Sequence, residues 1–304
     1  MQIGMIGLGR MGMNMAKRLL KGGHQVVAYN RSPDRTKEAV AQGAKGAYSL
    51  AELEPILKPP RVLWLMLPAG QPTDQHIDQL RLLLNKGDII VEGGNSFYKD
   101  DLRHARELKP RGIHYLDVGV SGGIWGLKIG YCLMIGGERN IFRRLEPLFK
   151  TLAPRNGYLY CGETGAGHFV KMTHNGIEYG MMSAYGEGFE LLQESPYGKN
   201  LDLAKVAHLW NQGSVVRSWL LELAESALKK DKNLSRLKGY VEDSGEGRWT
   251  VQQAVDLAVA SPVIACSLFQ RFRSRKTDSF SDRMLAALRN EFGGHAVVKA
   301  RKKR

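Results

Sequence analysis

Five side chains of different chemistry follow one another between residues 165 and 181. They are an amine, an imidazole, an amide, a carboxylate and a phenol, namely Lys171, His174, Asn175, Glu178 and Tyr179. At about 100° per residue, these positions share one sector of an α-helix. A solvent face with one charge pair is the alternative, but such faces usually repeat Lys and Glu. The mixture indicates a helix face that binds a polar ligand and transfers protons.

A glycine loop near the N-terminus is the second chemical signal. An apolar run at 2–7 leads into Gly-Leu-Gly-Arg-Met-Gly, and a helical pattern follows. In a nucleotide-binding loop the first glycine makes the tight turn, the second lets the backbone approach a pyrophosphate, and the third lets the helix pack closely. The helix N-terminus adds N–H groups and a partial positive charge. This context favours a dinucleotide site over a structural turn, at Gly7, Leu8, Gly9, Arg10, Met11 and Gly12.

The end of the second predicted strand, at 25–29, bears on the choice of dinucleotide. An acidic residue there binds the ribose hydroxyls of NAD and repels a 2′-phosphate. This chain has Asn30, Arg31 and Ser32 instead. Because a guanidinium beside a hydroxyl suits a phosphate monoester, we expect NADP to be favoured, with NAD as the second candidate. The alternative is that Arg31 is an ordinary surface arginine.

Two glycine-rich turns follow later predicted strands. The turn at 92–96 contains Asn95, and the turn at 120–123 contains Ser121, Gly122 and Gly123. Ligands of open α/β sheets bind beyond the carboxyl ends of the strands. The joint placement predicts that both turns line one pocket.

The pattern of predicted elements changes near residue 162. Before it, apolar strands alternate with helices, which indicates a parallel sheet covered on both faces; after it, only helical periodicity continues. We expect an α/β Rossmann-like dinucleotide-binding domain at 1–164 and an all-helical substrate and oligomerisation domain, with a basic tail, at 165–304. Strands are expected at 2–7, 25–29, 62–67, 88–92, 114–118, 131–135 and 158–161. Helices of the second domain are expected at 168–193, 203–211, 216–230, 250–260, 262–273 and 280–292.

Composition excludes several classes of protein. The 304 residues are 43% hydrophobic and 24% charged, which is ordinary for a globular chain and excludes a disordered one. The longest apolar run, at 62–67, is too short to span a membrane, and the first residues show no signal-peptide pattern. Three separated cysteines indicate no disulfide framework, and no cluster has the spacing of metal ligands. We therefore expect a cytoplasmic protein without a metal.

The formal net charge is +14, and five positive charges lie in the tail at 299–304. Such a charge suits nucleic acid or small polyanionic metabolites. No stripe of aromatic and basic residues accompanies it, so nucleic acid is the less favoured partner.

Together these motifs resemble the decarboxylating 6-phosphogluconate dehydrogenases, within the wider β-hydroxyacid dehydrogenase superfamily. The matching stretches lie at 7–14, 30–32, 93–96, 120–123, 165–181, 245–250 and 288–295. They cover nearly the whole chain, which is similar to a short form of the family. The resemblance implies oxidative decarboxylation of 6-phosphogluconate to ribulose 5-phosphate and CO2, with reduction of NADP or NAD, in the pentose phosphate pathway.

The resemblance also implies roles for individual residues. Lys171 would be the general base, and Glu178 the acid that completes the reaction. Contacts with substrate are implied for Asn95, Ser121, Gly122, Gly123, His174, Asn175, Tyr179, Arg289 and His295. Cofactor contacts are implied for Leu67, Pro68, Ala69 and Asn95, besides the glycine loop and residues 30–32. The family supplies the C-terminal pair, Arg289 and His295, to a neighbouring subunit, which implies a homo-oligomer, either a dimer or a tetramer.

Three positions depart from the family pattern. Pro68 stands where longer relatives often have lysine, and Glu246 stands where threonine is usual. The phosphate-binding arginine expected near Cys266 is missing, and Arg271, Arg273 or Arg275 could replace it.

Two other functions compete with this interpretation. One is a β-hydroxyacid dehydrogenase of the 3-hydroxyisobutyrate type, which does not decarboxylate and lacks the full run at 174–179. The other is a protein that binds polyanions or nucleic acid on a retired dinucleotide fold. Intact Lys171 and Glu178 argue against the second.

Overall fold

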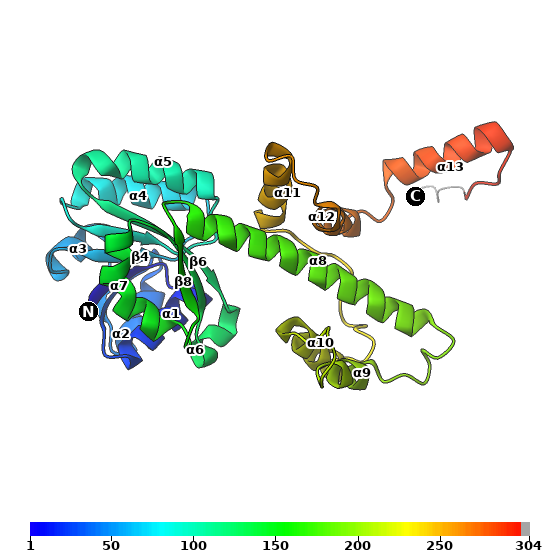
Figure 1. Cartoon of the computed structure of the whole chain (residues 1–304), viewed down its shortest axis with the longest axis horizontal. Coiled ribbons are helices and arrows are strands. Elements are labelled where there is room, and N and C mark those ends of the chain that lie inside the picture. The colour runs from blue at the N-terminus through cyan, green and yellow to red at the C-terminus, as the bar shows by residue number, and fades with distance from the viewer. Residues whose placement is uncertain (299–304) are drawn as a thin grey trace. The chain divides into compact units, whose positions relative to one another are not determined.

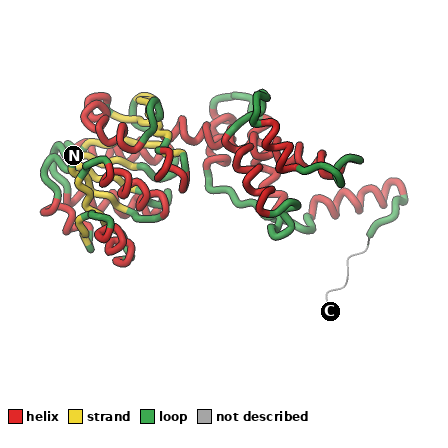
Figure 2. The backbone as a smooth tube through the Cα atoms, turned by 90° about the horizontal axis from the view of Figure 1, so that it is seen from below, coloured by secondary structure: helices red, strands yellow, loops and turns green. Residues whose placement is uncertain are grey.

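The computed structural model describes residues 1–298, without the side chain of Phe292, so the predicted basic tail lies outside the described residues. The chain divides into two compact units, Met1–Gly176 and Ile177–Arg304. The strands all belong to the first unit, and the described part of the second contains helices and loops (Figure 2). The predicted domain boundary after residue 164 falls between the last strand and the longest helix, and stays a prediction.

Eight strands of the first unit form one sheet in the order β3-β2-β1-β4-β5-β6-β7-β8. Figure 1 labels β4, β6 and β8 of this sheet. Their bounds are β1 Gln2–Ile6, β2 Gln25–Tyr29, β3 Lys45–Ala47, β4 Val62–Leu65, β5 Ile89–Glu92, β6 His114–Ser121, β7 Cys132–Gly137 and β8 Tyr158–Gly162. Met5 of β1 lies opposite Ala28 on one side and Trp64 on the other. The neighbouring strands β1, β4, β5 and β6 are parallel, so their carboxyl ends lie along one edge.

The prediction of a parallel sheet is wrong at one pair, because β6 and β7 are antiparallel. Their connection holds only a short turn and the helix α6 (Gly126–Ile129), and a parallel return needs a longer crossover. Strand β3 was not among the predicted strands. This strand has three residues, including Gly46 and an exposed Lys45, so it shows no apolar run.

Helices cover both faces of the sheet, as predicted. They are α1 Arg10–Lys21, α2 Pro33–Ala41, α3 Leu50–Ile56, α4 Gln71–Leu83, α5 Tyr98–Leu108 and α7 Arg139–Leu152. Trp64 packs with Met15 and Phe149 in the apolar cluster on one face. Its neighbour Leu65 belongs to the cluster on the other face, with Ile77. Successive side chains of β4 point to opposite faces of the sheet, so this one strand contributes to both apolar clusters.

The remaining helices follow β8 in the chain. They are α8 Ala166–Glu194, α9 Leu203–Trp210, α10 Trp219–Lys230, α11 Glu246–Asp256, α12 Pro262–Ser274 and α13 Phe280–Gly293. Helix α10 begins three residues later than predicted, because the Ser218 side chain caps it by accepting a hydrogen bond from the Leu221 N–H. Helix α11 begins four residues earlier than predicted, after Gly245, and ends before Ala258, whose φ is +53°. Within residues 1–298, no helix is both long enough and apolar enough to cross a membrane.

Candidate active site

The loop between β1 and α1 has the backbone of a phosphate-binding turn. Gly7 has a φ of +90°, and a Cβ on it would lie 2.4 Å from the Met66 carbonyl oxygen. A Cβ on Gly12 would lie 2.0 Å from the Gly7 oxygen, whereas a Cβ on Gly9 would meet nothing within 4 Å. Among the described residues, no side chain caps the first turn of α1, which begins at Arg10. The loop therefore fits a dinucleotide pyrophosphate at Gly9 and the helix N-terminus.

The side chain of Asn30, at the end of β2, stabilises the loop between β1 and α1 by a hydrogen bond. Its Oδ1 accepts a hydrogen bond of 2.9 Å from the Leu8 N–H, and its Nδ2 donates to the Ser32 carbonyl at 3.3 Å. Arg31 and Ser32 are exposed, and Arg31 has no ion-pair partner within residues 1–298. Arg35 is instead engaged with Glu38 at 2.9 Å. Arg31 is thus the arginine at this strand end that remains available to an anion.

The turns after β4 and β5 lie against one another. Leu67, Pro68 and Ala69 follow β4, and Thr73 donates a hydrogen bond of 2.9 Å to the Pro68 carbonyl. A Cβ on Gly94 would lie 2.5 Å from the Leu67 oxygen, so the next residue, the exposed Asn95, belongs to the same edge.

The turn after β6 joins this edge through α1. Asn14 donates a hydrogen bond of 3.4 Å to the Ile124 carbonyl, just after Gly122 and Gly123, whose φ values are +130° and +52°. Ser121 ends β6 and is half-buried. The predicted ligand turns of the first unit therefore meet at the carboxyl edge of the sheet.

Helix α8 is uninterrupted from Ala166 to Glu194 and carries the predicted acid–base face. Lys171 is 8% exposed, and a Cβ on Gly119 would lie 2.3 Å from the Lys171 Cβ, so the lysine stem packs on the β6 backbone. His174 Nδ1 and Asn175 Oδ1 lie 2.9 Å apart. Glu178 follows two helical turns after Lys171, about 10 Å along the axis.

The structure also reveals a buried group of ionisable side chains that sequence reasoning missed. Glu92, Asp101, Asp117 and His168 are each at most 1% exposed. In the ring of His168, Nδ1 lies 2.7 Å from Asp101 Oδ2 and Nε2 lies 3.1 Å from the Gly94 carbonyl oxygen. The backbone N–H of His168 donates a hydrogen bond of 2.9 Å to Asp117. The spacing of His168 could have identified it from the sequence, because it lies three residues before Lys171 and therefore on the same helix face.

Opposing effects set the protonation of this group. Burial alone lowers the pKa of His168, but Asp101, Glu92 and Asp117 overcome that effect and raise it to about 10. Burial raises the pKa of each of these three carboxyls. Ligand atoms of Glu92, Asp101 and His168 lie within 4.8 Å of one another, which would suit a metal ion. However, both ring nitrogens of His168 already face oxygen acceptors, as in a protonated imidazole.

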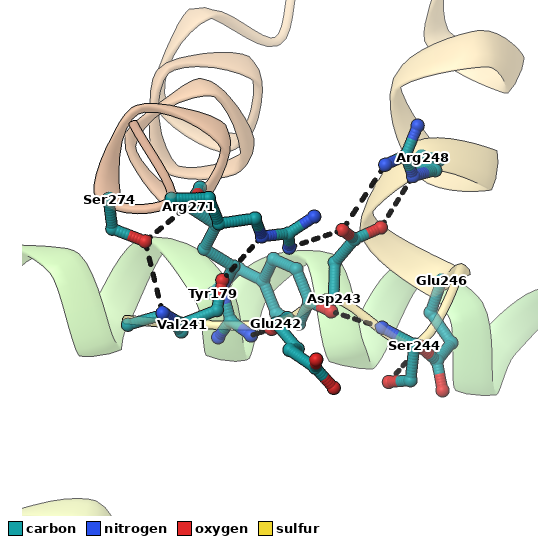
Figure 3. Close-up of polar contacts among 10 residues, drawn as sticks. Tyr179, Val241, Glu242, Asp243, Ser244, Glu246, Arg248, Arg271 and Ser274 are labelled. Atoms are coloured by element: carbon teal, nitrogen blue, oxygen red, sulfur yellow. Dashed lines mark hydrogen bonds and ion pairs between the residues drawn. The ribbon is translucent and has the colours of Figure 1, made fainter. Parts of the chain in front are cut away.

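In the second unit, Tyr179 is the centre of a polar cluster (Figure 3). It is 6% exposed, and its ring packs so closely on Gly247 that a Cβ there would lie 2.5 Å from a ring carbon. Its hydroxyl accepts a hydrogen bond of 3.4 Å from the Ser244 N–H. The Arg271 guanidinium lies 3.4 Å from the ring centroid and donates to the Glu242 carbonyl at 2.8 Å.

The other candidate arginines have different partners. Arg275 and Arg248 both bond Asp243, and the Arg248 hydrogen bond is the main reason that the pKa of Asp243 is lowered. Arg273 pairs with Asp282. Of the three arginines that could replace the missing one, Arg271 is therefore the one that contacts Tyr179.

Glu246, which departs from the family pattern, points inward. It is 1% exposed, and one of its carboxylate oxygens accepts a hydrogen bond of 2.7 Å from the Ser244 hydroxyl. The other oxygen has no hydrogen-bond partner within the described residues. Glu246 is thus part of the cluster around Tyr179 and not a surface substitution.

The C-terminal pair lies at the end of α13. Arg289 and His295 are exposed, and the His295 N–H donates to the Arg289 carbonyl at 3.4 Å. Asn290 donates a hydrogen bond of 2.8 Å to the His295 carbonyl. These bonds fix the backbone of His295 against the end of the helix that carries Arg289.

Comparison with known proteins covers both halves of the chain. The family model for the NAD binding domain of 6-phosphogluconate dehydrogenase matches residues 2–162, and the model for the C-terminal domain of the same enzyme matches residues 167–303. The chain is 51% identical over 299 residues to YqeC of Bacillus subtilis (strain 168), whose name assigns it provisionally to the 6-phosphogluconate dehydrogenases; this match covers 98% of the present chain and 100% of YqeC.

Two further similarities are to proteins of Haloferax volcanii and Plasmodium falciparum. The chain is 44% identical to a 6-phosphogluconate dehydrogenase of Haloferax volcanii, named as NAD(+)-dependent and decarboxylating, over 98% of this chain and 99% of that one. It superposes with a TM-score of 0.83, at 27% identity, on Plasmodium falciparum 6-phosphogluconate dehydrogenase, whose structures include complexes with NADP+ and 6-phosphogluconate. That match covers 100% of this chain and 67% of the other. The chain therefore belongs to the 6-phosphogluconate dehydrogenase family, whose members are NAD(P)-dependent oxidoreductases.

Proposed function

We propose that this chain oxidises and decarboxylates 6-phosphogluconate to ribulose 5-phosphate and CO2, with reduction of a nicotinamide dinucleotide. The observation that carries the proposal is the single polar face of α8, on which the buried Lys171 precedes Glu178 by two turns. The rival 3-hydroxyisobutyrate activity has less support, because both family models are those of 6-phosphogluconate dehydrogenase.

We also propose that the protein is cytoplasmic. Its three cysteines are free, which suits the cytoplasm.

The chemistry needs a base at the hydroxyl that is oxidised. We assign this role to Lys171, whose packing against Gly119 gives it the burial that a lysine base requires. A bound nicotinamide dinucleotide would supply the acceptor for the hydride that leaves C3. Oxidation at C3 makes a β-keto acid, which loses CO2 readily once the keto oxygen is protonated. Lys171 can return the abstracted proton to that oxygen.

The reaction ends with protonation of an enediol at the carbon that lost CO2, which is C1 of the product. We assign this step to Glu178, which lies on the same helix face as Lys171, His174 and Asn175. His174 and Asn175 would bind the substrate, together with Asn95, Ser121, Gly122, Gly123 and Tyr179.

We propose that the dinucleotide binds at the edge formed by the turns after β1, β2, β4 and β5. The contacts would come from Gly7, Leu8, Gly9, Arg10, Met11, Gly12, Asn30, Arg31, Ser32, Leu67, Pro68, Ala69 and Asn95. We favour NADP over NAD because no carboxylate stands at the end of β2, and because Arg31 is exposed there with no ion-pair partner among residues 1–298. NAD remains the second cofactor to test, since the Haloferax volcanii relative is named for it.

We propose that Arg271 binds the substrate phosphate. Its guanidinium is held over the Tyr179 ring by stacking and by one bond to a backbone carbonyl. That arrangement leaves donors of the planar guanidinium for an anion. Arg273 and Arg275 are instead engaged with Asp282 and Asp243.

We also propose a homo-oligomer in which Arg289 and His295 complete the site of another copy. Helix α13 supports this proposal because it exposes apolar side chains at helical spacing, namely Phe280, Met284, Leu285 and Leu288. Burial of this face by another copy would remove a large apolar surface from water.

The test is reduction of NADP or NAD in the presence of 6-phosphogluconate, followed by absorbance. Lys171→Met is expected to abolish turnover while the dinucleotide still binds, because the glycine loop is unchanged. Glu178→Gln should slow the overall reaction by about 10²–10⁴-fold, the usual cost of losing a general acid. If Lys171→Met kept a rate within tenfold of the parent, another residue would be the base.

A further inference from the structure

The buried group formed by Glu92, Asp101, Asp117 and His168 has no part in the proposed chemistry. Buried charges cost free energy unless they are paired and hydrogen-bonded, so such a group needs a structural or functional reason. Its members come from β5, α5, β6 and the first turn of α8. Two of these elements lead into residues of the proposed site, since Asn95 follows β5 and Lys171 follows His168.

Gly94 is held from two sides by this group. Its N–H donates to Glu92 Oε1 at 2.8 Å, and its carbonyl faces His168 Nε2 at 3.1 Å. A carbonyl oxygen only accepts hydrogen bonds, so the imidazole nitrogen donates this one. The Gly94 carbonyl belongs to the peptide bond that leads into Asn95. The orientation of Asn95 therefore depends directly on the ring of His168.

The backbone at His168 is fixed to β6. Asp117 accepts hydrogen bonds from the Gly165 N–H at 2.7 Å and from the His168 N–H at 2.9 Å, which satisfies donors at the start of α8. Lys171 lies one turn further and packs on Gly119, two residues after Asp117. The main chain of His168 is thus tied to the strand under Lys171, and its side chain to the turn that carries Asn95.

The charge of the ring strengthens this link. Asp101 lies 2.7 Å from Nδ1 and is itself held by the Tyr115 hydroxyl at 2.8 Å. Glu92 Oε2, which has no hydrogen-bond partner within the described residues, lies 3.6 Å from Nε2. An imidazolium between two carboxyls donates at both nitrogens, and hydrogen bonds from a charged donor are about twice as strong as neutral ones.

We propose that His168 is a positioning residue of the reaction, which as an imidazolium fixes the Gly94–Asn95 peptide relative to the turn of α8 that carries Lys171. The inference rests on the proposed function of Lys171 and Asn95. Its consequence is kinetic, because a displacement of about 1 Å between substrate and catalytic group can cost about 10²-fold in rate.

Two variants distinguish the contributions of the two ring hydrogen bonds of His168 to kcat. In His168→Gln the side-chain amide can reach the position of Nε2 and donate to Gly94, whereas in His168→Asn the amide matches Nδ1 and can bond only Asp101. We expect kcat to fall about 10²-fold in His168→Asn and only about tenfold in His168→Gln.

His104 offers a matched control. It is 2% exposed, lies on α5 in the same unit and contacts Asp74 at 2.7 Å, but has no bond to the 92–96 turn. His104→Gln should lower the melting temperature without changing kcat. Equal kcat in the two His168 variants, or a folded His168→Asn with kcat within threefold of the parent, would overturn the inference.

Amide hydrogen exchange keeps the test independent of the assay. If the parent chain fails to reduce a dinucleotide with 6-phosphogluconate, the proposed function is wrong, but the link can still be measured. His168→Asn should then speed exchange at Gly94 and Asn95, and His104→Gln should not; unchanged exchange overturns the link. A stoichiometric metal ion in the purified chain that disappears in His168→Asn would also overturn it, because His168 would then be a ligand.

Discussion

Arg31 is the residue whose role in choosing the dinucleotide can be tested most directly. If its guanidinium pairs with a 2′-phosphate, Arg31→Ala should weaken NADP binding by about ten- to a hundredfold, since such a charged hydrogen bond contributes roughly 1.5–3 kcal/mol. Binding of NAD should hardly change. Titration of both oxidised dinucleotides against parent and variant measures this. An equal loss for both would show that Arg31 supports the loop or stacks on adenine.

Arg271 and Arg273 lie two positions apart on α12 and form a natural pair for comparison. Arg271 stacks on Tyr179, whereas Arg273 is paired with Asp282. Arg271→Ala should raise the KM for 6-phosphogluconate by about ten- to a hundredfold, through loss of a charged contact with phosphate. Arg273→Ala should change it less than threefold. Steady-state kinetics of both variants decide the matter, and similar KM values would remove Arg271 from the phosphate site.

The raised pKa of His168 also predicts how stability changes with pH. The pKa is about 10 in the folded chain and 6.5 ordinarily, so the folded state binds more protons between these values. The contribution of His168 is therefore complete below about pH 6.5 and is lost as pH rises through about 10. The raised pKa values of Glu92, Asp101 and Asp117 act in the same direction.

Urea unfolding at several pH values between 6 and 10 checks this sign. The free energy of unfolding of the parent should fall as pH rises, and the fall should be smaller in His168→Gln, which has no titrating ring. Parallel curves for the two proteins would mean that folding does not raise the pKa of His168.

At the scale of elements, the close packing of α8 on β6 is open to test at one glycine. A Cβ on Gly119 would lie 2.3 Å from the Lys171 Cβ, so Gly119→Ala must push the helix or the strand aside. Overpacking of this kind usually costs about 1–3 kcal/mol, and here kcat should fall as well because Lys171 moves.

Gly186 gives the control on the same helix. A Cβ there meets nothing within 4 Å, so Gly186→Ala should keep kcat and stabilise the chain by about 0.5–1 kcal/mol through helix propensity. Thermal unfolding and turnover of both variants are the measurements. A Gly119→Ala chain with the stability and kcat of the parent would show that β6 and α8 are packed loosely enough to accommodate the added methyl group.

Elements with strong local patterns could be predicted from the sequence, and those set by distant contacts could not. The Gly7–Gly12 turn and α8 carry their own spacing, so their type and position were predictable. The reversal at β7 depends on the length of the connection from β6, and its apolar residues suit either direction. The bonds of His168 to Asp101 and Gly94 join residues 67 and 74 positions apart. A local sequence pattern does not predict contacts between residues so far apart in the chain.

At the scale of the whole molecule, the proposal of a shared site predicts rescue between two inactive chains. A Lys171→Met chain and an Arg289→Ala chain should each be inactive, and mixed oligomers should regain part of the activity in sites that combine intact Lys171 with intact Arg289. Activity after mixing, compared with each variant alone, is the measurement. Subunit exchange must be demonstrated separately, by mass spectrometry of tagged chains. Exchange without recovered activity, or a monomer with full turnover, would contradict the shared site.

The unbroken course of α8 also limits how the gene can change. Six residues separate Lys171 from Glu178, and one inserted codon would turn Glu178 by about 100° around the helix and move it about 1.5 Å along the axis. Four inserted codons would restore the direction but displace the carboxylate by about 6 Å. The loop at 195–202 has no such constraint. Length differences among descendants of this gene should therefore accumulate there, while the interval between the two residues stays constant.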